Sequence, residues 1–163
     1  MIAYAGFDRL SETIPIQNSW VMTAGLANCI AVVAFNYNSM AMAHFDTAFC
    51  WDQPNHCFNL NTLLNWRLWL TTRTGFTLFK VGLGAVWNNT ANKLAINDSQ
   101  RFDLINKITY VFRAEPLIAG ACIRFGTGLG FQPRLEESYV DIWMESANWK
   151  DEGHQIPYFE LMG

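Results

Sequence analysis

Cys29 and His44 are the two residues of this sequence whose types and spacing could support nucleophilic catalysis. They lie on two apolar runs typical of strands, Cys29–Phe35 and Met40–Phe45, and the Asn-rich segment 36–39 between these runs has turn chemistry. We therefore expect a β-hairpin with the cysteine on one arm and the histidine on the other. A histidine beside a cysteine activates it, because the imidazole takes up the thiol proton and returns it to the leaving group.

The turn of this hairpin decides whether the two side chains meet. If the loop is Asn36-Tyr37, Cys29 lies directly opposite His44, with Cβ atoms roughly 4.5–5.5 Å apart. If the loop is Tyr37-Asn38, or all of 36–39, the two residues are diagonal neighbours on one face, roughly 7–8 Å apart. A three-residue loop places them on opposite faces. Spacing alone also leaves ordinary structural roles open, since a buried cysteine often acts as a small hydrophobic residue.

The elements expected around the hairpin predict an α+β fold, with two main helices packed on a largely antiparallel sheet or sandwich. Strands outnumber helices, and each helix lies between strands. The expected strands are Trp20–Thr23, Phe76–Trp87, 117–125 and 129–131. The expected helices are Leu60–Thr72, closed by Gly75, and a second helix that Asp98 or Ser99 caps and that runs to about Phe112. Residues 1–18 are expected to be irregular, and 46–58 to form a loop.

Length and composition favour one globular domain over residues 1–163 and exclude several classes of protein. Hydrophobic residues make up 51% and charged residues 15% of the chain, which excludes a disordered segment. The net charge is -3 and no cluster of Lys and Arg occurs, so no nucleic-acid partner is expected. The longest apolar stretch, residues 20–35, is shorter than a membrane-spanning helix, and the N-terminus lacks a signal-peptide pattern, so we expect no membrane span and a cytoplasmic location.

A second group of reactive side chains, Cys50, Asp52, His56 and Cys57, contains residue types that bind metals. The spacing of its two cysteines does not match a zinc finger, and no second pair follows. We therefore favour a surface loop with free thiols over a zinc site or a disulfide.

The segment VMTAGLANCIAVVAFNYNSMAMAHF, residues 21–45, resembles the catalytic segment of the CheD family of chemoreceptor glutamine deamidases. In that family a turn of small residues precedes the cysteine, and a strand of small residues and methionine carries the histidine. A threonine stands six residues before the cysteine, and Thr23 holds that position here. Deamidating toxins related to cytotoxic necrotizing factor share the same Thr-Cys-His set.

Three later segments also resemble this family, so that the resemblance extends over about residues 20–131: FKVGLGAVW at 79–87, INDSQRFDLINKI at 96–108 and PLIAGACIRFGTGLGF at 116–131. The chain departs from the family in detail. Ala27-Asn28 replaces Gly-Ser before the cysteine, and Gly82-Leu83-Gly84 splits a double glycine. The aromatic-rich tail, residues 132–163, has no counterpart.

The resemblance implies a CheD-like layered sandwich and a protein-glutamine deamidase that needs no metal or organic cofactor. Cys29 would attack the carboxamide of a glutamine in a protein substrate, His44 would act as base, and Thr23 would orient His44. The backbone N–H of Cys29 and the turn at 24–28 would stabilise the oxyanion. The substrate would be a bacterial chemoreceptor or, for a secreted effector, a host protein, and a regulatory protein partner is possible. The alternatives are a catalytically inactive CheD-fold module that docks a protein partner, and another cysteine hydrolase.

Overall fold

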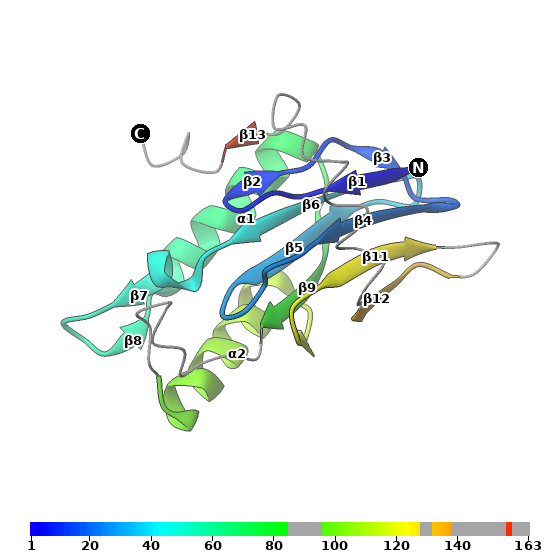
Figure 1. Cartoon of the computed structure of the whole chain (residues 1–163). Coiled ribbons are helices and arrows are strands. Elements are labelled where there is room, and N and C mark those ends of the chain that lie inside the picture. The colour runs from blue at the N-terminus through cyan, green and yellow to red at the C-terminus, as the bar shows by residue number, and fades with distance from the viewer. Residues whose placement is uncertain (85–95, 128–131, 138–155, 158–163) are drawn as a thin grey trace.

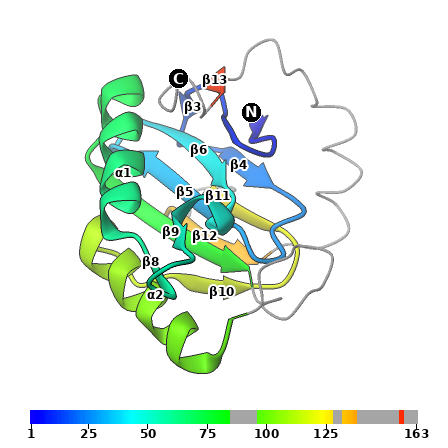
Figure 2. The same cartoon turned by 90° about the vertical axis from the view of Figure 1, so that its left-hand side faces the viewer.

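The computed structural model describes residues 1–84, 96–127, 132–137 and 156–157. In this part of the chain the fold is α+β, as the sequence predicts, and it has three layers (Figure 1). Two helices cover one face of a large central sheet, and a smaller sheet lies against the other face (Figure 2). The pairing is mostly antiparallel, again as expected.

The central sheet is built around the predicted hairpin, β5 (Ile30–Phe35) and β6 (Ser39–Phe45). Strand β9 (Leu78–Gly84) pairs with the other edge of β5. Shorter strands extend the sheet on both sides: β10 (Leu117–Ala119) beside β9, and β2 (Arg9–Leu10), β3 (Ile14–Pro15) and β13 (Ile156–Pro157) beyond β6. The hairpin therefore lies in the interior of the sheet, where both of its faces are covered.

The smaller sheet brings the N-terminal strand next to strands from the middle and the end of the described chain. Its order is β1 (Ile2–Tyr4), β4 (Ser19–Thr23), β11 (Ile123–Thr127) and β12 (Arg134–Glu137). Strand β1 pairs with β4 in parallel, and the other neighbours are antiparallel. Because β4 contacts β6, the end of β4 that carries Thr23 lies over the hairpin.

The two helices have the caps that their sequences support. Helix α1 (Leu60–Thr74) begins after Asn59, whose side chain accepts from the Thr62 N–H, and ends at Gly75 in the left-handed region, as predicted. Helix α2 (Asp98–Phe112) begins after Asn97. The expected N-caps Asp98 and Ser99 are thus wrong by one or two residues, because Asn97 and Gln100 form a reciprocal capping box.

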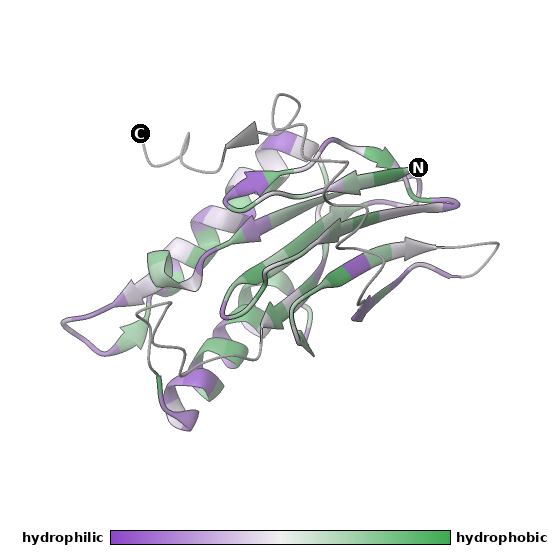
Figure 3. Ribbon diagram, in the orientation of Figure 1, coloured by the Kyte–Doolittle hydropathy of each residue, from purple (hydrophilic) through white to green (hydrophobic). Residues whose placement is uncertain are grey.

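Alternation along β5 divides its side chains between two cores, which explains why the strand is apolar throughout. Ile30 and Val32 face the helices and join a cluster that includes Trp66 and Trp69 of α1. Ala31 and Val33 face the smaller sheet and join a second cluster that includes Val21, Ile123 and Phe125. The hydropathy of the ribbon shows the same concentration of apolar residues in the interior strands (Figure 3). Cys29 belongs to the second cluster, between the two sheets.

Several segments differ from the sequence-based expectation. The single strand expected at 117–125 is two strands, β10 and β11, which belong to different sheets. The strand expected at 129–131 lies outside the described residues. Residues 1–18, expected to be irregular, contain β1, β2 and β3. Residues 46–58, expected to be a loop, contain a 3-10 helix, Thr47–Cys50, and a small hairpin of β7 (Trp51–Asp52) and β8 (Cys57–Phe58). Strands of two or three residues show too little alternation to be recognised, because pairing with distant partners specifies them.

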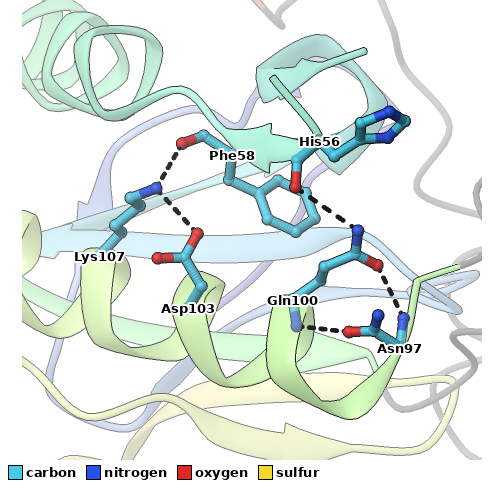
Figure 4. A network of polar contacts seen from close by, with 6 residues as sticks. All are labelled: His56, Phe58, Asn97, Gln100, Asp103 and Lys107. Atoms are coloured by element: carbon cyan, nitrogen blue, oxygen red, sulfur yellow. Dashed lines mark hydrogen bonds and ion pairs between the residues drawn. The ribbon is translucent and has the colours of Figure 1, made fainter. Parts of the chain in front are cut away.

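Polar contacts hold the β7–β8 hairpin against α2 (Figure 4). The Lys107 ammonium donates to the carbonyl oxygen of Phe58 at 2.7 Å and pairs with Asp103 at 2.8 Å. The Gln100 side chain donates to the carbonyl oxygen of His56 at 3.5 Å. These contacts fix the chain that leaves β6, and with it the end of the strand that carries His44.

We predict that Gly84→Ala destabilises the protein much more than Gly75→Ala. A Cβ at Gly84 would lie 1.8 Å from the Ala27 carbonyl oxygen, so the backbone before Cys29 must move, at a cost of about 3 kcal/mol or more. A Cβ at Gly75 meets nothing within 4 Å. The only cost of Gly75→Ala is that alanine must adopt the left-handed conformation, which lowers the free energy of unfolding by about 1 kcal/mol. Denaturant unfolding of both variants measures the difference, and equal losses of free energy would contradict the prediction.

Candidate active site

Cys29 and His44 lie on the same face of the central sheet. In the β5–β6 ladder Ala31 is directly opposite His44, and Ile30 is opposite Phe45. Cys29 is two residues before Ala31, so it shares that face and is a diagonal neighbour of His44, at roughly 7–8 Å along the sheet. Both side chains point between the two sheets, away from the helices, and both are buried.

This register selects one of the alternatives that the sequence left open. The loop is Tyr37-Asn38, closed by a hydrogen bond of 3.0 Å from the Asn36 N–H to the Ser39 carbonyl oxygen. The Asn36 side chain also accepts from the N–H groups of Asn38 and Ser39, both at 2.8 Å. A directly opposite Cys29–His44 pair, which a loop at Asn36-Tyr37 would give, is therefore excluded in this structure.

Thr23 reaches His44 from the smaller sheet. Its Oγ1 lies 2.7 Å from Nδ1 of His44 and donates its proton to the carbonyl oxygen of Ala5, also at 2.7 Å. A hydroxyl has one proton, so Thr23 must accept a hydrogen bond from a protonated Nδ1. His44 is thus held in the tautomer whose Nε2 carries a lone pair, the form required of a base. The orienting partner predicted by the resemblance is in contact with the histidine.

Nε2 of His44 is buried and has no hydrogen-bond partner among the described residues. Phe7 covers the imidazole edge to face, with ring centroids 5.4 Å apart, and is itself 55% exposed. Burial lowers the pKa of His44 from 6.5 to about 4, because a charged imidazolium would lose its hydration here. The ring is therefore neutral at physiological pH, with a free lone pair on Nε2.

The Cys29 thiol is protonated at neutral pH. Its side chain is 4% exposed, and burial raises its pKa far above the usual value. The nearby carboxylates of Asp46 and Asp8 raise the pKa further, because they repel a thiolate. In this structure the pair is thus a neutral thiol and a neutral imidazole, so proton transfer must accompany attack on a substrate.

The loop before Cys29 has a strained backbone at Ala27. Gly25 and Ala27 have φ of 66° and 24°, both in the left-handed region. The N–H of Cys29 donates to the carbonyl oxygen of Leu26, and the Leu26 N–H donates to Ala121 at 2.9 Å. The predicted use of the Cys29 N–H as an oxyanion donor is therefore contradicted in this structure, because Leu26 occupies that donor.

Asp8, which the sequence did not single out, belongs to the same site. It lies in a turn between β1 and β2, with φ of 55°, and is only 9% exposed. Its carboxylate accepts a hydrogen bond from the backbone N–H of Asp46, and burial raises its pKa to about 6. No sequence pattern identified Asp8. The turn that carries it lies near Cys29 only because β1 and β2 pair with strands that are distant in the sequence.

The other reactive residues do not join this site. Cys50 is buried and donates its thiol proton to the Thr47 carbonyl oxygen at 3.1 Å, whereas Asp52, His56 and Cys57 lie on the β7–β8 hairpin. Within the described ranges, no group of three or more His, Cys, Asp and Glu side chains could hold a metal ion. None of the described helices is long and apolar enough to cross a membrane. The tail, apart from 132–137 and 156–157, lies outside the described residues.

We predict that the stability of the wild type relative to His44→Gln falls as the pH drops from about 6.5 to about 4. Asp8, whose pKa is raised to about 6, acts in the opposite direction in both proteins, so its contribution cancels in the difference. The unfolded chain binds a proton at His44 below about pH 6.5, but the folded protein binds it only below about pH 4. Protonation therefore favours unfolding, by about 1.4 kcal/mol for each pKa unit, or on the order of 3 kcal/mol over the window. Urea unfolding against pH measures both proteins, and parallel curves would refute the assignment.

We further predict that Cys29 reacts slowly with iodoacetamide at neutral pH, more slowly than the partly exposed Cys57. A buried, protonated thiol is a poor nucleophile toward a small reagent. Peptide mapping after timed alkylation measures each cysteine separately. Fast reaction of Cys29 below pH 7 that His44→Ala abolishes would instead show a preformed thiolate–imidazolium pair.

Comparison with known protein families, with curated proteins and with solved structures gives no significant match to this chain.

Proposed function

We propose that this protein is a cysteine-dependent protein-glutamine deamidase of the CheD-like layered-sandwich type. Cys29 is the nucleophile, His44 is the general base and acid, and Thr23 positions His44. One observation carries the proposal: the Thr23 hydroxyl holds His44 at 2.7 Å with the Nε2 lone pair unpartnered, on the face that bears Cys29. The Thr-Cys-His set at the family spacing in residues 21–45 is the further support.

The reaction uses these groups in two halves. In the first, Nε2 of His44 takes the Cys29 proton while sulfur attacks the carboxamide carbon, and the same proton then passes to the amide nitrogen, which leaves as ammonia. In the second, water attacks the thioester carbon and gives its proton to His44. The carbon–sulfur bond breaks, and the thiol regains that proton. The net change is a glutamine side chain plus water to glutamate plus ammonia, without a metal or organic cofactor.

The neutral state of the pair fits this sequence of proton transfers. A neutral His44 can accept a proton, and a protonated Cys29 can supply it at the moment of attack. Catalytic contacts in a free enzyme are often longer than in the substrate complex, where they tighten. The Thr23–Ala5 hydrogen bond matters because it decides which imidazole nitrogen carries the lone pair.

The substrate class follows from the resemblance. It is a protein that presents a glutamine: a bacterial chemoreceptor for a cytoplasmic enzyme, which a regulatory protein partner would control, or a host protein for a secreted effector. Neighbouring genes for chemotaxis or for secretion would distinguish the two.

A second candidate is a catalytically inactive module of the same fold that docks a protein partner. Two observations favour it: the Cys29 thiol is buried with a strongly raised pKa, and its backbone N–H is occupied by Leu26. In that case His44 and Thr23 serve as a buried polar link between the two sheets, and substitutions there change stability without changing any rate.

We predict that a peptide in which a chloromethyl ketone replaces the glutamine carboxamide labels Cys29 selectively over Cys57. Labelling should fall about 10²–10⁴-fold in His44→Asn, because the base is lost. The labelling rate should fall less in Thr23→Val than in His44→Asn. In Thr23→Ser it should be close to the wild-type rate, because serine keeps the hydroxyl. The wild type should also release ammonia from a susceptible protein in a glutamine-bearing panel, with the corresponding change in mass.

Thermal unfolding of each variant is the control. If Thr23 had only a structural role, its variants would lose stability, but Thr23→Ser and Thr23→Val would label Cys29 at the same rate. Equal labelling of Cys29 in all variants, or preferential labelling of Cys57, would contradict the enzyme and favour the binding module.

A further inference from the structure

The turn that carries Asp8 closes one side of the candidate site. The Arg9 N–H donates to the carbonyl oxygen of Gly6 at 3.1 Å, which makes the turn tight, and Phe7 within it covers the ring of His44. Asp8 follows Phe7 and bonds to the backbone of Asp46, the residue two positions after His44. In the hairpin, Asp46 is one step beyond the Ile30–Phe45 pair, at the level of Cys29. The Asp8 carboxylate is thus held near the Cys29 thiol, and its neighbour Phe7 contacts the imidazole.

One oxygen of this carboxylate has no partner. Asp8 accepts the Asp46 N–H, but its Oδ1 is buried and makes no hydrogen bond within the described residues. The side chain is about nine-tenths buried, at 9% exposure. A buried polar atom without a partner costs roughly 1–3 kcal/mol, so such an atom in a native structure calls for an explanation. Nε2 of His44 is another buried atom at this site that makes no hydrogen bond within the described part of the chain.

We propose that Asp8 is a specificity-determining residue that selects carboxamides over carboxylates at Cys29. Its free oxygen accepts a hydrogen bond from the –NH2 group of an incoming carboxamide, and its charge repels a carboxylate. The proposal rests on the proposed function for the identity of that carboxamide as a glutamine side chain. Asp8 does not react itself, because its part is to orient the amide nitrogen and to reject the acid.

This selection suits a deamidase, whose substrate and product differ only in that group. Glutamine offers two N–H donors, whereas glutamate offers a second negative oxygen. A buried site that bonds a donor rejects an analogue lacking it, because its own acceptor is then left unpaired. The carboxylate product would therefore leave the site, and free carboxylates would compete poorly for it.

A purely structural role for Asp8 makes a different prediction. One oxygen accepting the Asp46 N–H is enough to cap the edge of β6, and an asparagine would do this equally well. Asp8→Asn keeps an acceptor for Asp46 and replaces the free oxygen with a neutral donor. The variant thus separates the structural contact from the proposed recognition.

The test uses two alkylating reagents of nearly equal size. Iodoacetamide carries a carboxamide, and iodoacetate carries a carboxylate. The rate of each is measured at Cys29 by peptide mapping on the full chain. Both reagents attack the same thiolate, so the ratio of the iodoacetamide rate to the iodoacetate rate at one cysteine does not depend on how much of that thiol is ionised. The same ratio at Cys57 gives the intrinsic difference in reactivity between the two reagents. We expect the ratio at Cys29 to exceed that at Cys57 by about tenfold, the effect of one nearby partly screened charge.

In Asp8→Asn the excess should disappear, because the new –NH2 group can donate a hydrogen bond to the carboxylate of iodoacetate. Asp46→Asn is the matched control: it removes the neighbouring charge, and asparagine can still cap the 3-10 helix by accepting the Ala48 N–H. It should keep most of the excess. An equal ratio at the two cysteines, an unchanged ratio in Asp8→Asn, or an equal loss in both variants would overturn the proposal.

A measurement on the wild type alone guards against misfolding of the variant. The excess should fall as the pH drops through about 6, where Asp8 takes up a proton. Asp46 and Cys29 are the titratable groups coupled to it, and His44 beside them stays neutral down to about pH 4. A ratio that does not change over this range overturns the proposal. The alkylation rate ratios can be measured without catalytic turnover. Absence of ammonia release would therefore reject the proposed deamidase activity, whereas the rate ratios alone would decide the role of Asp8.

Discussion

The hydrogen bond between Thr23 and His44 is the constraint on which the rest of the site depends. It joins the two sheets at a point where each side chain is fully buried. Thr23 can accept the Nδ1 proton because its own proton goes to Ala5, a residue held by the parallel pairing of β1 and β4. The tautomer of His44 is thus set by strand pairing. Few single hydrogen bonds in this fold depend on as many separate elements.

The layering of the fold serves this contact. The helices cover one face of the central sheet, and the hydrogen-bonded pair of Thr23 and His44 lies on the opposite face, among the apolar side chains between the two sheets. On that face, small side chains such as Ala31 and Cys29 leave room for the imidazole between the sheets. The close approach of Gly84 to the loop before Cys29 fixes the end of β5 in the same way. The position of the nucleophile therefore depends on packing from three strands.

Sequence patterns predicted the hairpin, both helices and the α+β class, because these elements have strong local periodicity. They did not predict the register, since the turns compatible with Asn36–Ser39 give three different registers, and the choice depends on two hydrogen bonds of the Asn36 side chain. Thr23 was identified through the family resemblance, not through spacing. Asp8 was missed because a turn between strands of three and two residues shows no pattern of its own. Its place beside Cys29 follows from pairing over long distances along the chain.

The burial of Cys29 has a consequence for how the chain resists oxidation. Peroxides attack the thiolate, and the raised pKa keeps that form scarce in the folded protein. In the unfolded chain the same thiol has an ordinary pKa and full exposure, so sulfenic acid forms there first. Of the four cysteines, Cys57 alone is partly exposed in the native fold. Folding therefore protects the Cys29 thiol chemically, and a destabilised chain, which unfolds more often, would lose Cys29 to oxidation faster.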